Sequence, residues 1–77
     1  MKIKDAVLLQ KQIGARIKEL RKEKGISQEA FADACGLHRT HMSLLERGKV
    51  NVTLNTLSQI TNMLGIRLKD FFSEMKR

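Results

Sequence analysis

The chain has 77 residues, enough for one domain, and 42% of them are hydrophobic, as in folded globular proteins. Fifteen Lys and Arg against eight Asp and Glu give a net charge of +7, which favours polyanionic partners such as nucleic acid. No apolar stretch approaches the roughly 20 residues that span a bilayer, and one cysteine cannot form an intramolecular disulfide. We therefore expect a single cytoplasmic domain over residues 1–77, without membrane insertion.

Helical periodicity predicts a first helix whose apolar stripe contains Ile13, Ile17 and Leu20. The stripe continues towards the N-terminus, so residues 1–9 are expected to extend this helix or to form an arm. Gly25, followed by an apolar residue, is typical of the end of a helix. The folded core is thus expected to begin near Ile13.

Further helix ends and starts are marked along the rest of the chain. Gly36, Gly48 and Gly65 are placed where helices are expected to stop, and Ser27 and Thr53 are suitable N-caps for new helices. This punctuation predicts an all-α domain of five helices. The side chains expected to face the core from the second to the fifth helix are Phe31, Ala32, Cys35, Met42, Leu45, Leu54, Leu57, Ile60, Leu64, Leu68, Phe71, Phe72 and Met75.

The second and third helices are separated only by the turn of residues 36–38. A three-residue link that contains glycine holds two helices at a steep angle. Once the inward positions are removed, the third helix exposes Arg39, Thr40 and Ser43 as one strip. A guanidinium and two hydroxyls are suited to reading base edges in the major groove of DNA, which admits one α-helix.

These features resemble the Cro/CI-type, or Xre-type, helix-turn-helix DNA-binding proteins. The resemblance covers about residues 13–72 and is carried by IGARIKELRKEKGISQEAFA, CGLHRTHMS, LERGKVNVTLNTL and LGIRLKDFF. It implies a compact, five-helix lambda-repressor-like domain with the helix-turn-helix at about 28–47. It also implies a sequence-specific transcription regulator with neither enzymatic activity nor a cofactor. Within the family, HRTHMSLLERG most resembles the controller proteins of restriction–modification systems.

The resemblance assigns roles to individual residues. Arg39 is expected to read a base, although a phosphate contact is the alternative. Leu44 would touch a thymine methyl group or lie at the edge of the core, and Gln28 would bind a phosphate or be a solvated first-turn residue. Arg21 and Glu46 are expected to form a buried salt bridge. The expected base contacts are Arg39, Thr40, Ser43 and Leu44, and the expected phosphate contacts are Gln28, His41, Arg47, Lys49 and Asn51.

Cys35, His38 and His41 have a spacing that could suggest a metal site. Structural zinc sites need four ligands and catalytic sites need three that converge, whereas Cys35 is expected to face inward, away from both histidines. We therefore expect no metal. His41 suits a phosphate contact, and His38 occupies the N-cap position of the third helix, for which histidine is a weak choice.

One small helix-turn-helix contacts few base pairs, which favours a homodimer on a palindromic operator in double-stranded DNA, with half-sites about 34 Å apart. RNA polymerase is a further possible partner. The rivals are an antitoxin or phage-type repressor, a protein-interaction adaptor that has lost DNA binding, and a membrane-active helix. The residues expected at the dimer interface, unless they all belong to the intramolecular core, are Leu57, Ile60, Met63, Phe71, Phe72 and Met75.

Overall fold

The computed structural model describes residues 3–75 of the chain and contains five α-helices in that range, with no strand. The predicted all-α, five-helix fold is confirmed. No helix in the described range is long and apolar enough to cross a membrane. The helices are α1 (Ile3–Glu23), α2 (Gln28–Ala34), α3 (Arg39–Glu46), α4 (Leu54–Leu64) and α5 (Leu68–Ser73).

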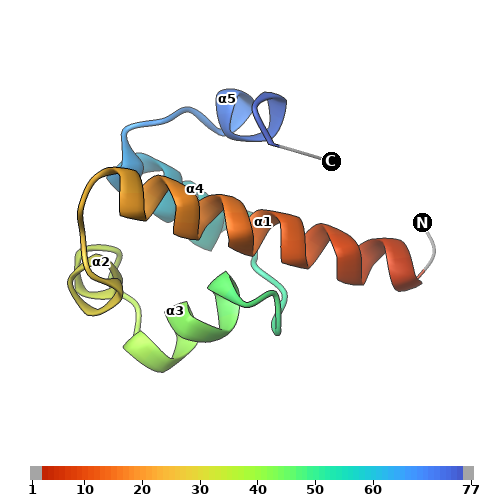
Figure 1. Cartoon of the computed structure of the whole chain (residues 1–77), viewed down its shortest axis with the longest axis horizontal. Coiled ribbons are helices and arrows are strands. Elements are labelled where there is room, and N and C mark those ends of the chain that lie inside the picture. The colour runs from red at the N-terminus through yellow and green to blue at the C-terminus, as the bar shows by residue number, and fades with distance from the viewer. Residues whose placement is uncertain (1–2, 76–77) are drawn as a thin grey trace.

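Helix α1 is the longest element, and the other helices are arranged around it (Figure 1). Helices α2 and α3 lie on one side of α1, α4 packs behind it, and α5 lies on the opposite side from α3. The N-terminal part of α1 projects beyond the other four helices. Residues 3–9 therefore extend the helix and do not form an arm, and residues 1–2 lie outside the described range.

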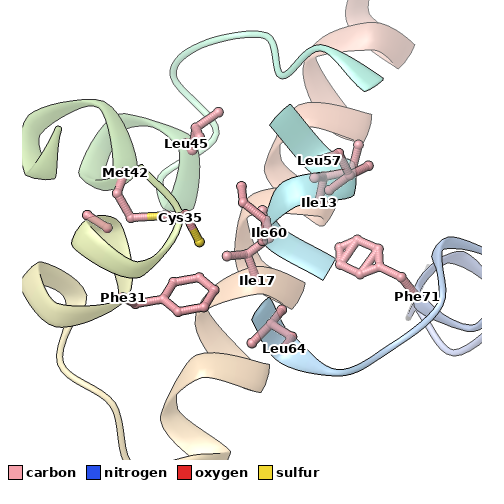
Figure 2. Packing of buried hydrophobic residues seen from close by; sticks show 11 residues of the cluster. Ile13, Ile17, Phe31, Cys35, Met42, Leu45, Leu57, Ile60, Leu64 and Phe71 are labelled. Atoms are coloured by element: carbon pink, nitrogen blue, oxygen red, sulfur yellow. The ribbon is translucent and has the colours of Figure 1, made fainter. Parts of the chain in front are cut away.

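One hydrophobic core is shared by all five helices (Figure 2). Ile17 of α1 is fully buried, and the rings of Phe31 and Phe71 enter the core from α2 and α5. The remaining core side chains are mostly aliphatic, as the absence of Trp and Tyr requires. The core consists of Ile13, Ile17, Phe31, Ala32, Cys35, Met42, Leu45, Leu57, Ile60, Leu64 and Phe71.

The predicted caps form where the sequence places them. Ser27 Oγ accepts a hydrogen bond from Ala30 N at 3.1 Å, and Thr53 Oγ1 accepts one from Thr56 N at 3.1 Å. Helix α4 ends at Gly65, whose φ of 70° lies in the left-handed region that favours glycine. Each cap satisfies backbone groups that have no partner inside the helix.

Two expected core residues do not face the core. Leu54 is 73% exposed because it is the first residue of α4, and the helix reaches the core only one turn later, at Leu57. Phe72 is 38% exposed, because consecutive helical residues point about 100° apart and its neighbour Phe71 takes the buried direction. The two rings pack edge to face, with centroids 5.5 Å apart.

Candidate nucleic-acid interface

Helix α3 is held against α1 by an unusually close backbone contact at Gly14. A Cβ atom added there would lie 2.2 Å from the carbonyl oxygen of Leu45 and 2.8 Å from that of Glu46. Both are backbone atoms, so no side chain can move to relieve the overlap. An isolated glycine inside a helical pattern often marks such packing, and Gly14 is a residue that the sequence-based predictions missed. Gly14 therefore fixes how closely α3 approaches α1.

The predicted ion pair of Arg21 and Glu46 joins the same two helices. Arg21 Nε donates to Glu46 Oε2 at 2.7 Å and Nη2 donates to Oε1 at 2.9 Å, with both side chains buried. Arg21 Nη1 also donates to the carbonyl oxygen of Ile26 at 2.8 Å. The hydrogen bond to Glu46 raises the pKa of Arg21 and outweighs the lowering by desolvation. The buried carboxylate thus faces a cation that stays charged.

Gln28, at the start of α2, shares this carboxylate. Its Nε2 donates to Glu46 Oε1 at 3.0 Å, and the side chain is partly buried. Because an ionised carboxylate only accepts hydrogen bonds, the amide nitrogen of Gln28 must face Glu46. The second N–H and the amide oxygen stay free of this bond. The side chain of Gln28 is therefore held in one orientation by this hydrogen bond. It is not the fully solvated first-turn residue that was the alternative prediction for Gln28.

His38 caps α3 with its ring. The residue is extended, with φ −71° and ψ 142°, and Nδ1 accepts a hydrogen bond from Thr40 N at 3.1 Å. Nδ1 can accept this bond only when it carries no proton. The weak cap expected from the sequence is thus formed, by a ring nitrogen where Ser, Asn or Asp would use an oxygen.

The outer side of α3 lies next to Gln28 and forms a shallow hollow. Arg39 and Thr40 are exposed there, and Ser43 is partly exposed. The hollow measures about 230 Å³ and is lined by these three residues and Gln28. Leu44 is partly buried, which leaves both of its expected roles open. Three of the four expected base-contacting residues are thereby brought together with one expected phosphate contact.

The other expected phosphate contacts are exposed, but two of them have internal hydrogen bonds. Arg47 Nε donates to the carbonyl oxygen of Ser43 at 3.3 Å. Asn51 Oδ1 accepts from Nε2 of Gln10 in α1, a contact for which the sequence offers no signal. The amide nitrogen of Asn51 is a donor that this bond does not use. The expected phosphate contacts exposed on α3 and in the segment that follows it are His41, Arg47, Lys49 and Asn51.

The cysteine and the two histidines do not converge. Cys35 is buried in the core, where burial raises the pKa of its thiol. His38 is occupied as a cap, and His41 is exposed on α3. Over the described residues, no group of three or more Cys, His, Asp or Glu side chains is arranged to hold a metal ion. Cys35 thus acts as a small hydrophobic side chain.

Half of the residues expected at the dimer interface are buried in the monomer, as the intramolecular-core alternative predicts for them. Leu57, Ile60 and Phe71 are only 2%, 0% and 0% exposed, because they fill the core of the monomer. They are therefore not available to a second chain. Met63 and Phe72 are exposed, at 48% and 38%. Met75 is partly buried and packs against the core.

The short α2–α3 turn, the buried inner side of α3 and its polar outer side define the class of helix-turn-helix domains. The family model described as "Helix-turn-helix" matches residues 17–71. The chain therefore belongs to the helix-turn-helix family, and the predicted resemblance is confirmed.

Restriction–modification controller proteins are among the chains most similar to this one. Control protein C.MunI of a Mycoplasma species is 46% identical over 65 residues, covering 83% of this chain and 88% of the relative. The structure of C.AhdI from Aeromonas hydrophila has a TM-score of 0.77 and 37% identity, covering 80% and 94% of the two chains. A structure of the nucleoprotein complex of C.Esp1396I has a TM-score of 0.76 and 35% identity, covering 84% of each chain.

Proposed function

We propose that this chain is a sequence-specific transcription regulator that binds operator DNA as a homodimer and controls a restriction–modification system. The family and the similar controller proteins support this assignment. A regulator that binds DNA would act in the cytoplasm. Contact with RNA polymerase there would allow DNA binding to change the rate of transcription. No step of this function requires a cofactor or chemical catalysis.

The observation that carries the proposal is the hollow shared by Gln28, Arg39, Thr40 and Ser43. Arg39 provides a planar fork of donors that matches the O6 and N7 acceptors of guanine, and the two hydroxyls can donate or accept. The free N–H of Gln28 is suited to a phosphate at the edge of the groove. One concave surface therefore combines base-reading groups with a group that sets the register on the backbone.

The connector after α3 is suited to the flanking phosphates. Lys49 and Asn51 are exposed there, and the N-terminus of α4 follows at Leu54. Cations, amide donors and the unpaired N–H groups of a helix start all attract phosphate. These contacts would add affinity without selecting a sequence.

Two copies are needed because one small domain reads only a few base pairs. Met63 of α4 and Phe72 of α5 are the exposed members of the expected dimer surface, and a ring or thioether exposed in the monomer would be buried on association. Sedimentation measures the outcome: dimers are expected for the wild type and monomers for Phe72→Glu. A wild type that is monomeric at micromolar concentration contradicts the dimer.

Selection of bound sites from a pool of random duplex DNA tests the function. The expected result is a palindromic site with half-sites centred about 10 base pairs, or one helical turn, apart. A pool that gains no shared sequence after repeated rounds contradicts sequence-specific binding. The adaptor alternative predicts that outcome together with capture of a protein partner that Arg39→Ala does not disturb.

A further inference from the structure

Helix α1 carries a stripe of exposed lysines that none of the roles above uses. Its members are separated by seven, seven and four residues, which places them within about 20° of one line along the helix. The stripe is about 27 Å long, from 18 residues at 1.5 Å each. All ion pairs found over residues 3–75 use arginine as the cation, so they leave these lysines unneutralised. The lysine stripe consists of Lys4, Lys11, Lys18 and Lys22.

The acidic residues of α1 lie on another flank. Asp5, Glu19 and Glu23 are about 80–120° around the helix from the lysine stripe. Gly14, which faces α3, is about 60° from the stripe in the opposite direction. The positive flank is therefore the one next to α3, and the negative flank is the one farther from it.

The lysine stripe adjoins the connector that is proposed to hold phosphates. Gly48 packs directly on Lys11, since an added Cβ atom would lie 2.6 Å from Lys11 Cα and 2.8 Å from its Cγ. The neighbouring Gln10 is hydrogen bonded to Asn51 of the connector. Beyond this point α1 projects past the other helices towards its N-terminal end (Figure 1). The connector, with its exposed Lys49, therefore lies against the part of α1 that carries Lys11.

We propose that the lysine stripe binds the phosphate backbone of the operator beside the segment that α3 reads. This inference rests on the proposed DNA-binding function. Duplex DNA carries one negative charge per roughly 1.7 Å, and each phosphate neutralised by a lysine releases condensed counterions. At about 27 Å the stripe is shorter than one DNA turn of about 34 Å. The flexible ammonium groups contact phosphate without reading sequence.

The test compares the salt dependence of binding for Lys11→Gln and Lys69→Gln, which change the net charge equally. Lys69 is exposed on α5 and is not part of the stripe. Glutamine keeps the Cγ atom on which Gly48 packs, so thermal unfolding of both variants is expected to match the wild type. The probes are two duplexes with the site selected from random DNA, one ending at the site and one with about 10 further base pairs, one helical turn, on each side.

Because the operator-bound dimer carries two copies of each lysine, Lys11→Gln is expected to reduce the slope of log Kobs against log salt on the longer duplex by about 1.8, and Lys4→Gln with Lys11→Gln by about 3.6. Lys69→Gln should keep the wild-type slope. Identical slopes for Lys11→Gln and Lys69→Gln overturn the inference, while a base preference that Arg39→Ala relaxes at one position of each half-site shows that the function itself stands. If the wild type prefers no sequence, the proposed function fails and the inference falls with it.

An acidic surface of a protein such as RNA polymerase is the other polyanion that could occupy the stripe. In that case the lysine variants bind DNA with the wild-type slope but lose regulation in a transcription reporter. That pair of results also overturns the inference, and it reassigns the stripe to a protein contact.

Discussion

Helix α3 has only eight residues, yet its two sides have different roles. The inner side buries Met42, Leu45 and Glu46 against α1 and the core. The outer side exposes Arg39 and Thr40. The inner side therefore sets where the helix lies, and the outer side is free to be selected for what it binds.

Gln28 connects the two sides. It is hydrogen bonded to the buried carboxylate of Glu46 and also lines the outer hollow with Arg39. The buried ion pair thus orients a group at the surface as well as joining two helices. Changes to the inner side should lower the free energy of unfolding, and changes to the outer side should lower DNA affinity alone.

The largest expected effect is that of Glu46→Ala on stability. The substitution leaves Arg21 buried without its partner, which costs about 3–5 kcal/mol, a large part of the roughly 5–10 kcal/mol typical of such a domain. Urea unfolding measures the loss. Asp70→Asn is the control, because it breaks an ion pair whose Arg67 side chain is 80% exposed, and it should cost less than about 1 kcal/mol. Equal effects would show that the buried pair is not special.

Gly14→Ala should destabilise the chain by about 2–3 kcal/mol, because the new methyl group overlaps backbone carbonyls of α3. Gly25→Ala provides the comparison. Its φ of 69° disfavours a side chain, at about 1–2 kcal/mol, but nothing lies within 4 Å of the added atom. Unfolding curves that show a smaller loss at Gly14 than at Gly25 would contradict the close contact of α1 and α3.

Arg39→Ala should leave the free energy of unfolding within about 0.5 kcal/mol of the wild type. It should cost about 1–3 kcal/mol of binding free energy for each half-site of the selected site, with relaxed preference at one base pair in each half-site. Lys49→Ala serves as the matched loss of one charge and should weaken selected and random duplexes alike. Titrations on the selected and the random duplex distinguish the two variants. If Arg39→Ala loses equal binding free energy on both duplexes, Arg39 does not read a base.

The smallest expected effect concerns the ring that caps α3. His38→Ala removes the acceptor for Thr40 N and should cost about 0.5–1 kcal/mol in unfolding experiments. His38→Asn supplies an oxygen in the same place and should restore the loss. If neither substitution changes stability, the cap contributes nothing in solution.

Most of the fold could be predicted because its signals are local. The glycines and the Ser27 and Thr53 caps marked the helix boundaries, and the apolar period identified nearly all of the core. Leu54 and Phe72 were placed wrongly, because periodicity does not show where along a helix the core ends or which of two adjacent rings wins the buried direction.

The site was predictable only in part. The Arg21–Glu46 pair was expected from the family resemblance and is present. The bond from Gln28 to Glu46 and the bond from Gln10 to Asn51 join residues far apart in the chain, so no local pattern indicates them. The dimer surface was overestimated because the three most buried of its six residues are needed by the monomer core.

The most direct test of the account is to repeat the selection from random duplex DNA with Arg39→Ala beside the wild type. If α3 reads bases through Arg39, the wild type enriches a two-fold symmetric site. The variant should then enrich the same site with one symmetric pair of positions, guanine in the wild-type pool, no longer restricted. Identical pools from the two proteins, or no enrichment by the wild type, would contradict the central claim that the outer side of α3 recognises DNA sequence.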